Sequence, residues 1–243
     1  MKALQDMKAM VLAAGKGTRM RALSDRLPKP LVPVAGRTLI DRILDHLKAA
    51  GIQKPVVNIH HLADQMEAHL GDRVVISDER NALLETGGGV KKALPLLGDD
   101  PVFVINSDAL WTDGPGDSAL KRMHDHFVSE TMDVLLLLVA REDALGYDGK
   151  GDFLCDVTPD KAVPLTFRGE APEAPVMFGG VMIVKPTLYR DMPEGAWSNL
   201  LIFKQAAAAG RLYGLLHDGA WMHVGTPEAI EAAEARLKAL GAA

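Results

Sequence analysis

The sequence contains one cysteine, no long apolar run and no surplus of positive charge. A lone Cys155 cannot form an internal disulfide, which indicates a reducing compartment, and we expect the cytoplasm. The longest apolar run, residues 134–140, is far shorter than the roughly 20 residues that cross a bilayer as a helix, so we expect no membrane partner. Lysine and arginine number 27 against 32 aspartates and glutamates, and the net charge of −5 argues against a nucleic-acid partner.

The length of 243 residues, 48% of them hydrophobic, is enough for one large core, and we expect a single domain over residues 1–243. Met7-Lys8-Ala9 repeats the first three residues, Met1-Lys2-Ala3, which suggests that residues 1–6 are a dispensable extension. The final helix follows soon after residue 226 and leaves no room for an appended β-helix of hexapeptide repeats, so we expect no second, acetyltransferase activity.

Short apolar runs rich in β-branched residues alternate with amphipathic stretches along the chain. This alternation predicts an α/β fold, a Rossmann-like, mostly parallel mixed sheet with helices on both faces. Strands are expected at residues 8–13, 56–59, 74–76, 102–105, 134–139, 152–156, 163–168 and 176–184. Helices are expected at residues 38–50, 62–70, 89–97, 117–128, 198–209 and 227–240.

A glycine-rich loop follows the first expected strand, from Ala13 to Met20. Glycines at 15 and 17 permit main-chain conformations that a Cβ would block, so the amides of residues 14–18 can point at phosphate oxygens. Arg19 adds a planar charged fork that suits phosphate. The spacing fits neither a P-loop nor the dinucleotide-binding fingerprint, and taken alone the loop could be a plain connection.

Lys29 lies between two prolines in the segment Pro28-Lys29-Pro30-Leu31-Val32-Pro33, which cannot form a regular helix. The prolines fix the local backbone and hold the Lys29 ammonium in place at little further entropic cost. Taken alone, the segment could be a rigid surface loop with a solvated lysine.

Asn106-Ser107-Asp108 follows the buried run at 102–105. Ligands collect at the carboxyl ends of strands in an open α/β sheet, so Asp108 stands where a cation would bridge to phosphate. The alternative is that Asp108 caps the next helix.

The loop and the framed lysine together resemble the signature of sugar-1-phosphate nucleotidyltransferases, G-x-G-T-R followed by P-K-P-L-x-P. The resemblance covers almost the whole chain, and through Leu84-Glu85-Thr86-Gly87-Gly88 it is most similar to bacterial N-acetylmuramate-1-phosphate uridylyltransferases. It implies the nucleotide-diphospho-sugar transferase fold, with a nucleotide-binding half over about 7–130 and a sugar-binding half over about 131–243. It also implies the reaction of UTP, or another nucleoside triphosphate, with a sugar 1-phosphate, most simply N-acetylmuramate 1-phosphate in cell-wall recycling, with release of pyrophosphate.

The resemblance assigns roles to individual residues. Arg19 would bind the departing phosphates, Lys29 the reacting phosphate and Asp108 a metal ion, and these are the candidate catalytic residues. The nucleotide is expected at Ala13, Ala14, Gly15, Gly17, Thr18, Arg19, Lys29, Glu85, Thr86, Gly87 and Asn106. The sugar is expected near Gly151, Asp152 and Gly179, although such glycines also admit close packing of strands.

The second metal ligand of the family departs from the pattern in this sequence. Trp221-Met222-His223-Val224-Gly225-Thr226 resembles W-x-D-x-G-T, but His223 replaces the aspartate. Imidazole suits transition metals better than magnesium, so Mg²⁺ is expected as cofactor and Mn²⁺ is an alternative. A histidine that packs near the site without touching metal is equally compatible with the sequence.

A sugar 1-phosphate is mostly dianionic near neutrality, so no side chain needs to remove a proton from it. The rival chemistry is a covalent nucleotidyl-histidine, for which the candidates are His60, His61, His124 and His126. We expect single displacement, by an enzyme that is a monomer or a small homo-oligomer.

Other functions remain open from the sequence. Mannose-1-phosphate guanylyltransferases and glucose-1-phosphate thymidylyl- or uridylyltransferases share the loop. A catalytically silent sensor of nucleotide-sugars would fit His223, whereas a glycosyltransferase would need a carboxylate at Asn106.

Overall fold

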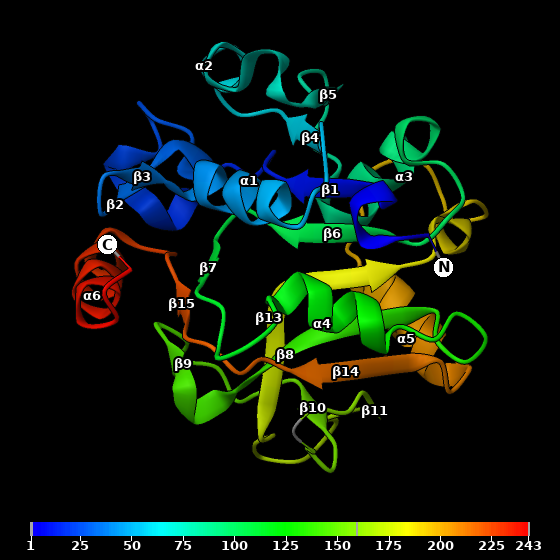
Figure 1. The fold of residues 1–243 in the computed structure, drawn as a ribbon. Helices are drawn as coiled ribbons and strands as arrows, with labels where there is room; N and C mark the ends of the chain where they lie inside the picture. Colours follow the sequence, from blue (N-terminus) through cyan, green and yellow to red (C-terminus); the bar gives the residue numbers. More distant parts are fainter. Residues whose placement is uncertain (1, 159, 243) are drawn as a thin grey trace.

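The computed structural model describes residues 2–158 and 160–242, and a mixed ten-stranded sheet runs through the described molecule (Figure 1). Eight of its strands follow the order β11-β14-β8-β13-β6-β1-β4-β5, and β10 and β12 pair beside β13. The long strands are β1 (Ala9–Leu12), β4 (Val56–Ile59), β5 (Val75–Asp78), β6 (Val102–Asn106), β8 (Val134–Ala140), β13 (Val176–Val184) and β14 (Leu212–Leu216). The short ones are β10 (Phe153–Leu154), β11 (Val163–Pro164) and β12 (Thr166–Phe167).

Strands β6, β1, β4 and β5 are parallel, so their carboxyl ends meet at one edge of the sheet. In register, Leu12 of β1 pairs with Asn58 on one side and with Asn106 on the other. Two amide side chains therefore flank the point where the chain leaves β1. Strand β13 pairs antiparallel with both β6 and β8 and joins the two halves of the sheet.

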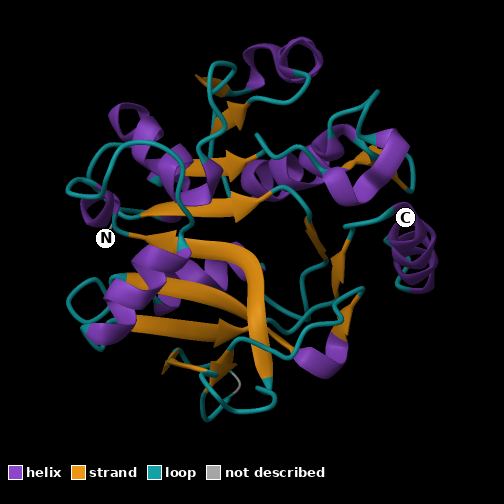
Figure 2. Ribbon diagram, turned by 180° about the vertical axis from the view of Figure 1, so that it is seen from behind, coloured by secondary structure: helices purple, strands orange, loops and turns teal. Residues whose placement is uncertain are grey.

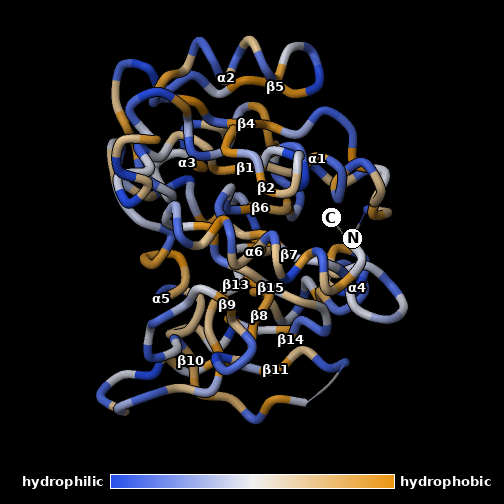
Figure 3. Tube along the Cα trace, turned by 90° about the vertical axis from the view of Figure 1, so that its left-hand side faces the viewer, coloured by the Kyte–Doolittle hydropathy of each residue, from blue (hydrophilic) through white to orange (hydrophobic). Residues whose placement is uncertain are grey.

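Alternate residues of the strands serve the two faces of the sheet. One face carries α1 (Leu39–Ala49), α2 (Ala63–Leu70) and α4 (Ala119–His126), and the other carries α3 (Glu85–Leu97) and α5 (Leu200–Ala208). Figures 1 and 2 view these two faces from opposite sides, with α1 and α4 in front in Figure 1. Figure 3 shows hydrophobic stretches along the central strands and hydrophilic ones in the outer loops, as expected for strands buried on both faces.

A second, three-stranded sheet lies beside the carboxyl edge. It contains β7 (Ala109–Trp111), β15 (Trp221–His223) and β9 (Ala144–Leu145). Helix α6 (Pro227–Ala239) follows β15 and packs on the hairpin of β2 (Pro33–Val34) and β3 (Arg37–Thr38). The C-terminal helix thus lies against an N-terminal segment, as Figure 1 shows.

The predicted α/β architecture with helices on both faces is confirmed, but several boundaries were wrong. Helix α3 begins at Glu85 instead of residue 89, so the glycines at 87–89 lie within its N-terminal part. A Cβ at Gly87 would lie 2.2 Å from Trp197, and one at Gly88 would lie 2.1 Å from the carbonyl oxygen of Gly195, so glycine permits this packing. The strand expected at 163–168 is two short strands, and six strands of the described residues, β2, β3, β7, β9, β14 and β15, were missed.

At the N-terminus, Leu4 packs against the hydrophobic core, and the suggestion that residues 1–6 are dispensable stays a prediction. None of the helices in the described ranges is both long and apolar enough to cross a bilayer.

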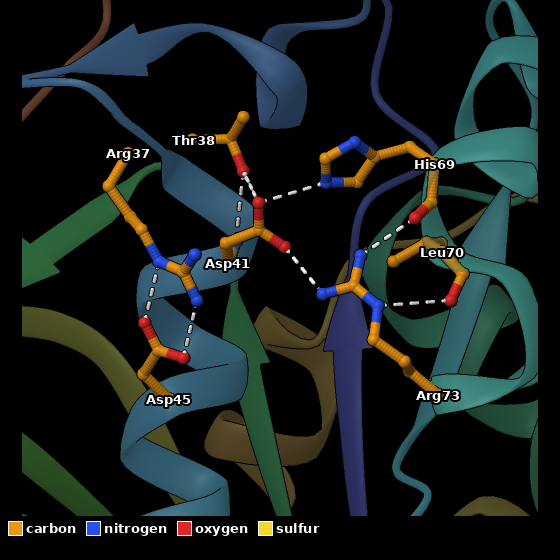
Figure 4. Close-up of polar contacts among 7 residues, drawn as sticks. All are labelled: Arg37, Thr38, Asp41, Asp45, His69, Leu70 and Arg73. Atoms are coloured by element: carbon orange, nitrogen blue, oxygen red, sulfur yellow. Dashed lines mark hydrogen bonds and ion pairs between the residues drawn. The ribbon is translucent and has the colours of Figure 1, made fainter.

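Asp41 anchors the start of α1 to α2 and the turn that follows α2 (Figure 4). Its carboxylate accepts hydrogen bonds from Thr38 Oγ1 at 2.7 Å, His69 Nε2 at 2.9 Å and Arg73 Nη1 at 2.8 Å. Burial opposes the ionisation of Asp41, but these hydrogen bonds outweigh it, so its pKa lies below the ordinary value.

We expect Asp41→Asn to lower the free energy of unfolding by about 1–3 kcal/mol at pH 7, because an amide cannot accept from all three donors. Since the folded-state pKa is depressed, this stabilisation is present above pH 3.8 and is lost as the pH falls further. Urea unfolding at pH 7 and pH 3 measures both effects. Asp45→Asn is the matched control, because Asp45 is exposed and its pair with Arg37 contributes less than about 1 kcal/mol. Equal losses in the two variants would contradict the prediction.

Candidate active site

A cavity of about 440 Å³ opens at the carboxyl edge of β1, β4 and β6. Its lining residues are Leu12, Ala14, Gly15, Gly17, Thr18, Arg19, Lys29, Pro30, Asn58, Leu83, Glu85, Thr86, Asn106, Ser107, Asp108, Ser198 and Gly225. The glycine-rich loop, the framed lysine and the strand tip, which the sequence indicated separately, line this one cavity.

Gly17 allows the loop to cross directly over Lys29. Its φ is +62°, in the left-handed region, and a Cβ there would lie 2.9 Å from Cβ of Lys29. Both the backbone conformation and the space therefore require glycine at this position.

Ala13 lies behind the loop instead of facing the cavity. Its backbone N–H donates to Oδ1 of Asn58 at 2.7 Å, so this amide is already engaged. Ala14, Gly15, Gly17, Thr18 and Arg19 line the cavity, whereas Ala13 does not. Of the loop residues at which the sequence predicted the nucleotide, Ala13 is therefore the one that does not line the cavity.

Four side chains lie close together at the carboxyl end of β6. Lys29 Nζ lies 2.8 Å from Asp108 Oδ2, and His223 Nε2 lies 3.4 Å from the same oxygen. Arg19 Nη2 lies 3.4 Å from His223 Nε2. The Lys29 side chain is only 10% exposed, whereas that of Asp108 is 31% exposed, so the carboxylate remains accessible to a ligand.

The pKa of Asp108 lies well below its ordinary value. Burial opposes ionisation, but the hydrogen bond with His223 and the positive charge of Lys29 outweigh it. Asp108 is therefore an anion at neutral pH, as a cation ligand must be.

Asp108 and His223 form a pair at this point and not a complete metal cage. The described residues contain no group of three or more His, Cys, Asp or Glu side chains that could hold an ion. Magnesium is commonly bound by one or two carboxylates together with substrate phosphates, so one aspartate beside a phosphate cavity fits such an ion.

Glu85, Thr86 and Gly87, which the sequence predicts to bind the nucleotide, make contacts that sequence patterns do not reveal. Thr86 Oγ1 accepts from the backbone N–H of Asn199 at 2.9 Å, while Glu85 and Thr86 line the cavity. Gly87 N–H donates to the carbonyl oxygen of Trp197 at 2.8 Å, and Gly87 is not among the lining residues. Of the three, Glu85 and Thr86 are thus placed to meet a ligand.

A second cavity of about 410 Å³ adjoins the first, and Thr86, Asn106 and Ser198 line both. Its other lining residues are Gly151, Asp152, Phe153, Phe167, Arg168, Gly169, Phe178, Asn199, Leu200 and Phe203. Of the three residues near which the sequence predicted the sugar, Gly151 and Asp152 line this cavity. Gly179 is not among its lining residues: its carbonyl oxygen accepts from Trp221 Nε1 at 2.8 Å, and a Cβ would lie 2.9 Å from Val139.

Sequence reasoning missed Asn58 and Arg168. Asn58 is a polar residue at the carboxyl end of an apolar strand, and that signal could have found it. Arg168 belongs to no motif, and only the fold brings it into the second cavity.

The four histidines considered for covalent catalysis lie outside both cavities. His60 donates to the carbonyl oxygen of Glu79 and His61 to that of Ser24. His124 pairs with Asp125, and His126 contacts backbone oxygens of Arg122 and Asp160. None is placed to attack a bound nucleotide.

Glu79 is hydrogen-bonded to two segments that border the first cavity, through Asn58 and Leu84. The residue is fully buried, and its carboxylate accepts from Nδ2 of Asn58 at 2.8 Å and from the backbone N–H of Leu84 at 3.3 Å. Burial raises the pKa of Glu79, although these hydrogen bonds act in the opposite direction. Through Asn58 it fixes Ala13 at the start of the loop, and through Leu84 it fixes the start of α3.

We expect Glu79→Ala to lower the free energy of unfolding by about 2–4 kcal/mol, because two donors lose their acceptor and a cavity opens. The KM for the nucleoside triphosphate should rise more than kcat falls, since the loop is held less firmly. Urea unfolding and steady-state kinetics measure the two effects. Glu142→Ala, at an exposed glutamate, is the control, and an unchanged KM in Glu79→Ala would refute the supporting role.

The family model for nucleotidyl transferases matches residues 8–148 of the chain. The N-acetylmuramate alpha-1-phosphate uridylyltransferase of Caulobacter vibrioides is 47% identical over 237 residues, which cover 94% of this chain and 96% of that protein. The protein of the same name from Neisseria meningitidis serogroup B is 36% identical over 236 residues, with 94% and 97% covered. Among solved structures, UDP-glucose pyrophosphorylase from Acinetobacter baumannii superposes with a TM-score of 0.76 at 20% identity, covering 95% of this chain and 93% of that one.

The chain therefore belongs to the nucleotidyl transferase family and is a sugar-1-phosphate nucleotidyltransferase, as the loop and the framed lysine predicted. Within that family it is similar to the N-acetylmuramate alpha-1-phosphate uridylyltransferases over nearly the full length of both chains.

Proposed function

We propose that the protein transfers UMP from UTP to N-acetylmuramate 1-phosphate and releases pyrophosphate. The observation that carries the proposal is the pair of adjoining cavities, one lined by the glycine-rich loop, Arg19 and Lys29 and the other mainly apolar, in a chain 47% identical to an N-acetylmuramate alpha-1-phosphate uridylyltransferase. We propose that the whole chain acts as one catalytic domain in the cytoplasm, as a monomer or a small homo-oligomer. The central sheet supports the single domain, because its strands come from both halves of the sequence.

The triphosphate would lie in the first cavity, under the amides of residues 14–18. Arg19, exposed beside the loop, would bind the departing pyrophosphate through its fork, and the buried Lys29 would hold the phosphate of the sugar. The sugar ring would lie against the phenylalanines of the second cavity, and Asn106 would stand between the two substrates because it lines both cavities.

Catalysis then consists of positioning and charge neutralisation. The dianionic sugar phosphate attacks the α-phosphorus directly, so no catalytic base is needed. Holding two anions in line and balancing the charge of the leaving pyrophosphate lowers the barrier. Single displacement predicts inversion at the α-phosphorus, and the isolation of a nucleotidyl-enzyme would rule it out.

Asp108, with His223 beside it, would hold a divalent ion, Mg²⁺ or Mn²⁺, in this scheme. When bound, the ion supplies positive charge to the phosphates. The Asp108 carboxylate would hold the ion, and Lys29 Nζ, 2.8 Å from Asp108 Oδ2, would add a second positive charge near the phosphates.

We expect His223→Asp to shift the metal preference from Mn²⁺ towards Mg²⁺, because a second carboxylate replaces a softer imidazole at the same place. The readouts are Mn²⁺ affinity by electron paramagnetic resonance and the ratio of kcat/KM with the two metals. His217→Asn is the control, since His217 is buried and outside the first cavity. An unchanged affinity and ratio would show that His223 does not contact the ion.

The function is tested by pyrophosphate release from a panel of nucleoside triphosphates and sugar 1-phosphates. We expect UTP with N-acetylmuramate 1-phosphate to give the highest kcat/KM. A preference for GTP with mannose 1-phosphate, or for dTTP or UTP with glucose 1-phosphate, would overturn the assignment of substrate, and no turnover with any pair would overturn catalysis.

A further inference from the structure

Arg168 is a cation in the second cavity that the chemistry of phosphate transfer does not use. Arg19 and Lys29, to which the proposed function assigns the phosphates, both line the first cavity. Among the described lining residues of the second cavity, Arg168 is the sole cation and Asp152 the sole anion, and the remainder are mainly aromatic and apolar. A guanidinium in a largely apolar cavity is stabilised by an anionic partner.

The backbone around Arg168 fixes its guanidinium on one edge. Nε donates to the carbonyl oxygen of Gly151 at 3.2 Å, and Nη1 donates to those of Ala171 at 2.5 Å and Gly169 at 3.4 Å. Within residues 2–158 and 160–242, Nη2 has no protein acceptor. The guanidinium is thus held in place with one nitrogen free to donate.

The acidic residue of the cavity does not neutralise Arg168. Asp152 Oδ2 accepts from the backbone N–H of Phe178 at 2.8 Å, and the two charged side chains form no ion pair in the described structure. An anionic group on the substrate can therefore reach the free nitrogen.

We propose that Arg168 binds the lactyl carboxylate of N-acetylmuramate 1-phosphate and determines specificity for it. The inference rests on the proposed function. That substrate carries two anionic groups, the phosphate and the carboxylate of the lactyl ether, and the two adjoining cavities offer two separate cationic centres. N-acetylglucosamine 1-phosphate has the same acetamido sugar and phosphate but lacks the lactyl group, so it has no partner for Arg168.

The test compares these two substrates in wild-type enzyme and Arg168→Met, which keeps an unbranched stem but removes the charge. We expect kcat/KM for N-acetylmuramate 1-phosphate to fall about 10- to 100-fold, mainly through KM, as a charged hydrogen bond is lost. For N-acetylglucosamine 1-phosphate and for UTP the values should stay near those of the wild type, which also shows that the variant is folded. Lys150→Met is the matched control, because Lys150 is exposed and lies outside the cavity lining.

A second comparison changes the substrate instead of the protein. With wild-type enzyme, replacing the lactyl carboxylate by a carboxamide should lower kcat/KM by a factor similar to that of Arg168→Met. With Arg168→Met the same replacement should lower kcat/KM little further, so the two losses should not add. Equal losses for both sugars in Arg168→Met, or no loss for either, would overturn the role of Arg168. Absence of turnover of N-acetylmuramate 1-phosphate by the wild-type enzyme would instead overturn the proposed function.

Discussion

Asp108→Asn is expected to lower kcat by about 100- to 1,000-fold or more while the fold is kept. Asparagine has nearly the volume of aspartate but no negative charge, so it can neither hold a divalent ion nor balance Lys29, whose ammonium lies 2.8 Å away. The carboxylate is ionised at every pH where the enzyme would be assayed, because its pKa lies well below the ordinary value. The loss should therefore appear in kcat across the whole pH range.

The measurement is pyrophosphate release at saturating substrates, with circular dichroism to confirm the fold. Asp125→Asn is the matched control, because Asp125 is an exposed helical residue paired with Lys121. The kcat of this variant should equal that of the wild type. A near-native kcat in Asp108→Asn would remove Asp108 from the reaction and would leave Lys29 as the main charged group at the strand tip.

The parts of the fold that the sequence predicts well are those set by local pattern. The runs that form β1, β4 and β6 are apolar and end at polar or glycine-rich segments, so their position and burial follow from periodicity. The rule that ligands gather at the carboxyl ends of parallel strands then brings Asp108 and the loop together.

Other parts depend on partners that no local pattern specifies. Strand β15 has three residues and exists because it pairs with β7 and β9, from far earlier in the chain. The contact between Lys29 and Asp108 joins residues 79 positions apart, and neither motif predicts it. Glu79 stands in the polar sequence Ser-Asp-Glu-Arg-Asn, typical of a surface turn, yet it is fully buried because Asn58 and Leu84 supply its hydrogen bonds.

Lys29→Met is expected to lower kcat/KM for the sugar phosphate by about 100- to 1,000-fold, because a fixed charge at the reacting phosphate is lost. The ammonium is fixed from three sides: Pro28 and Pro30 hold its backbone, Gly17 covers its stem and Asp108 orients its tip. Such a group needs no reorganisation when charge develops on the phosphates, and this makes its contribution large.

The same enclosure predicts that Lys29→Arg does not restore activity. The ammonium lies 2.8 Å from Asp108 Oδ2 on a side chain that is only 10% exposed, and a longer, planar guanidinium cannot place its charge at the same point. Lys16→Met is the matched control in the same loop, because Lys16 is exposed and does not line the cavity, and its kcat/KM should change far less. If Lys29→Arg keeps most of the activity, or if Lys16→Met is as impaired as Lys29→Met, the charge acts over a distance and the enclosure of Lys29 contributes nothing to catalysis.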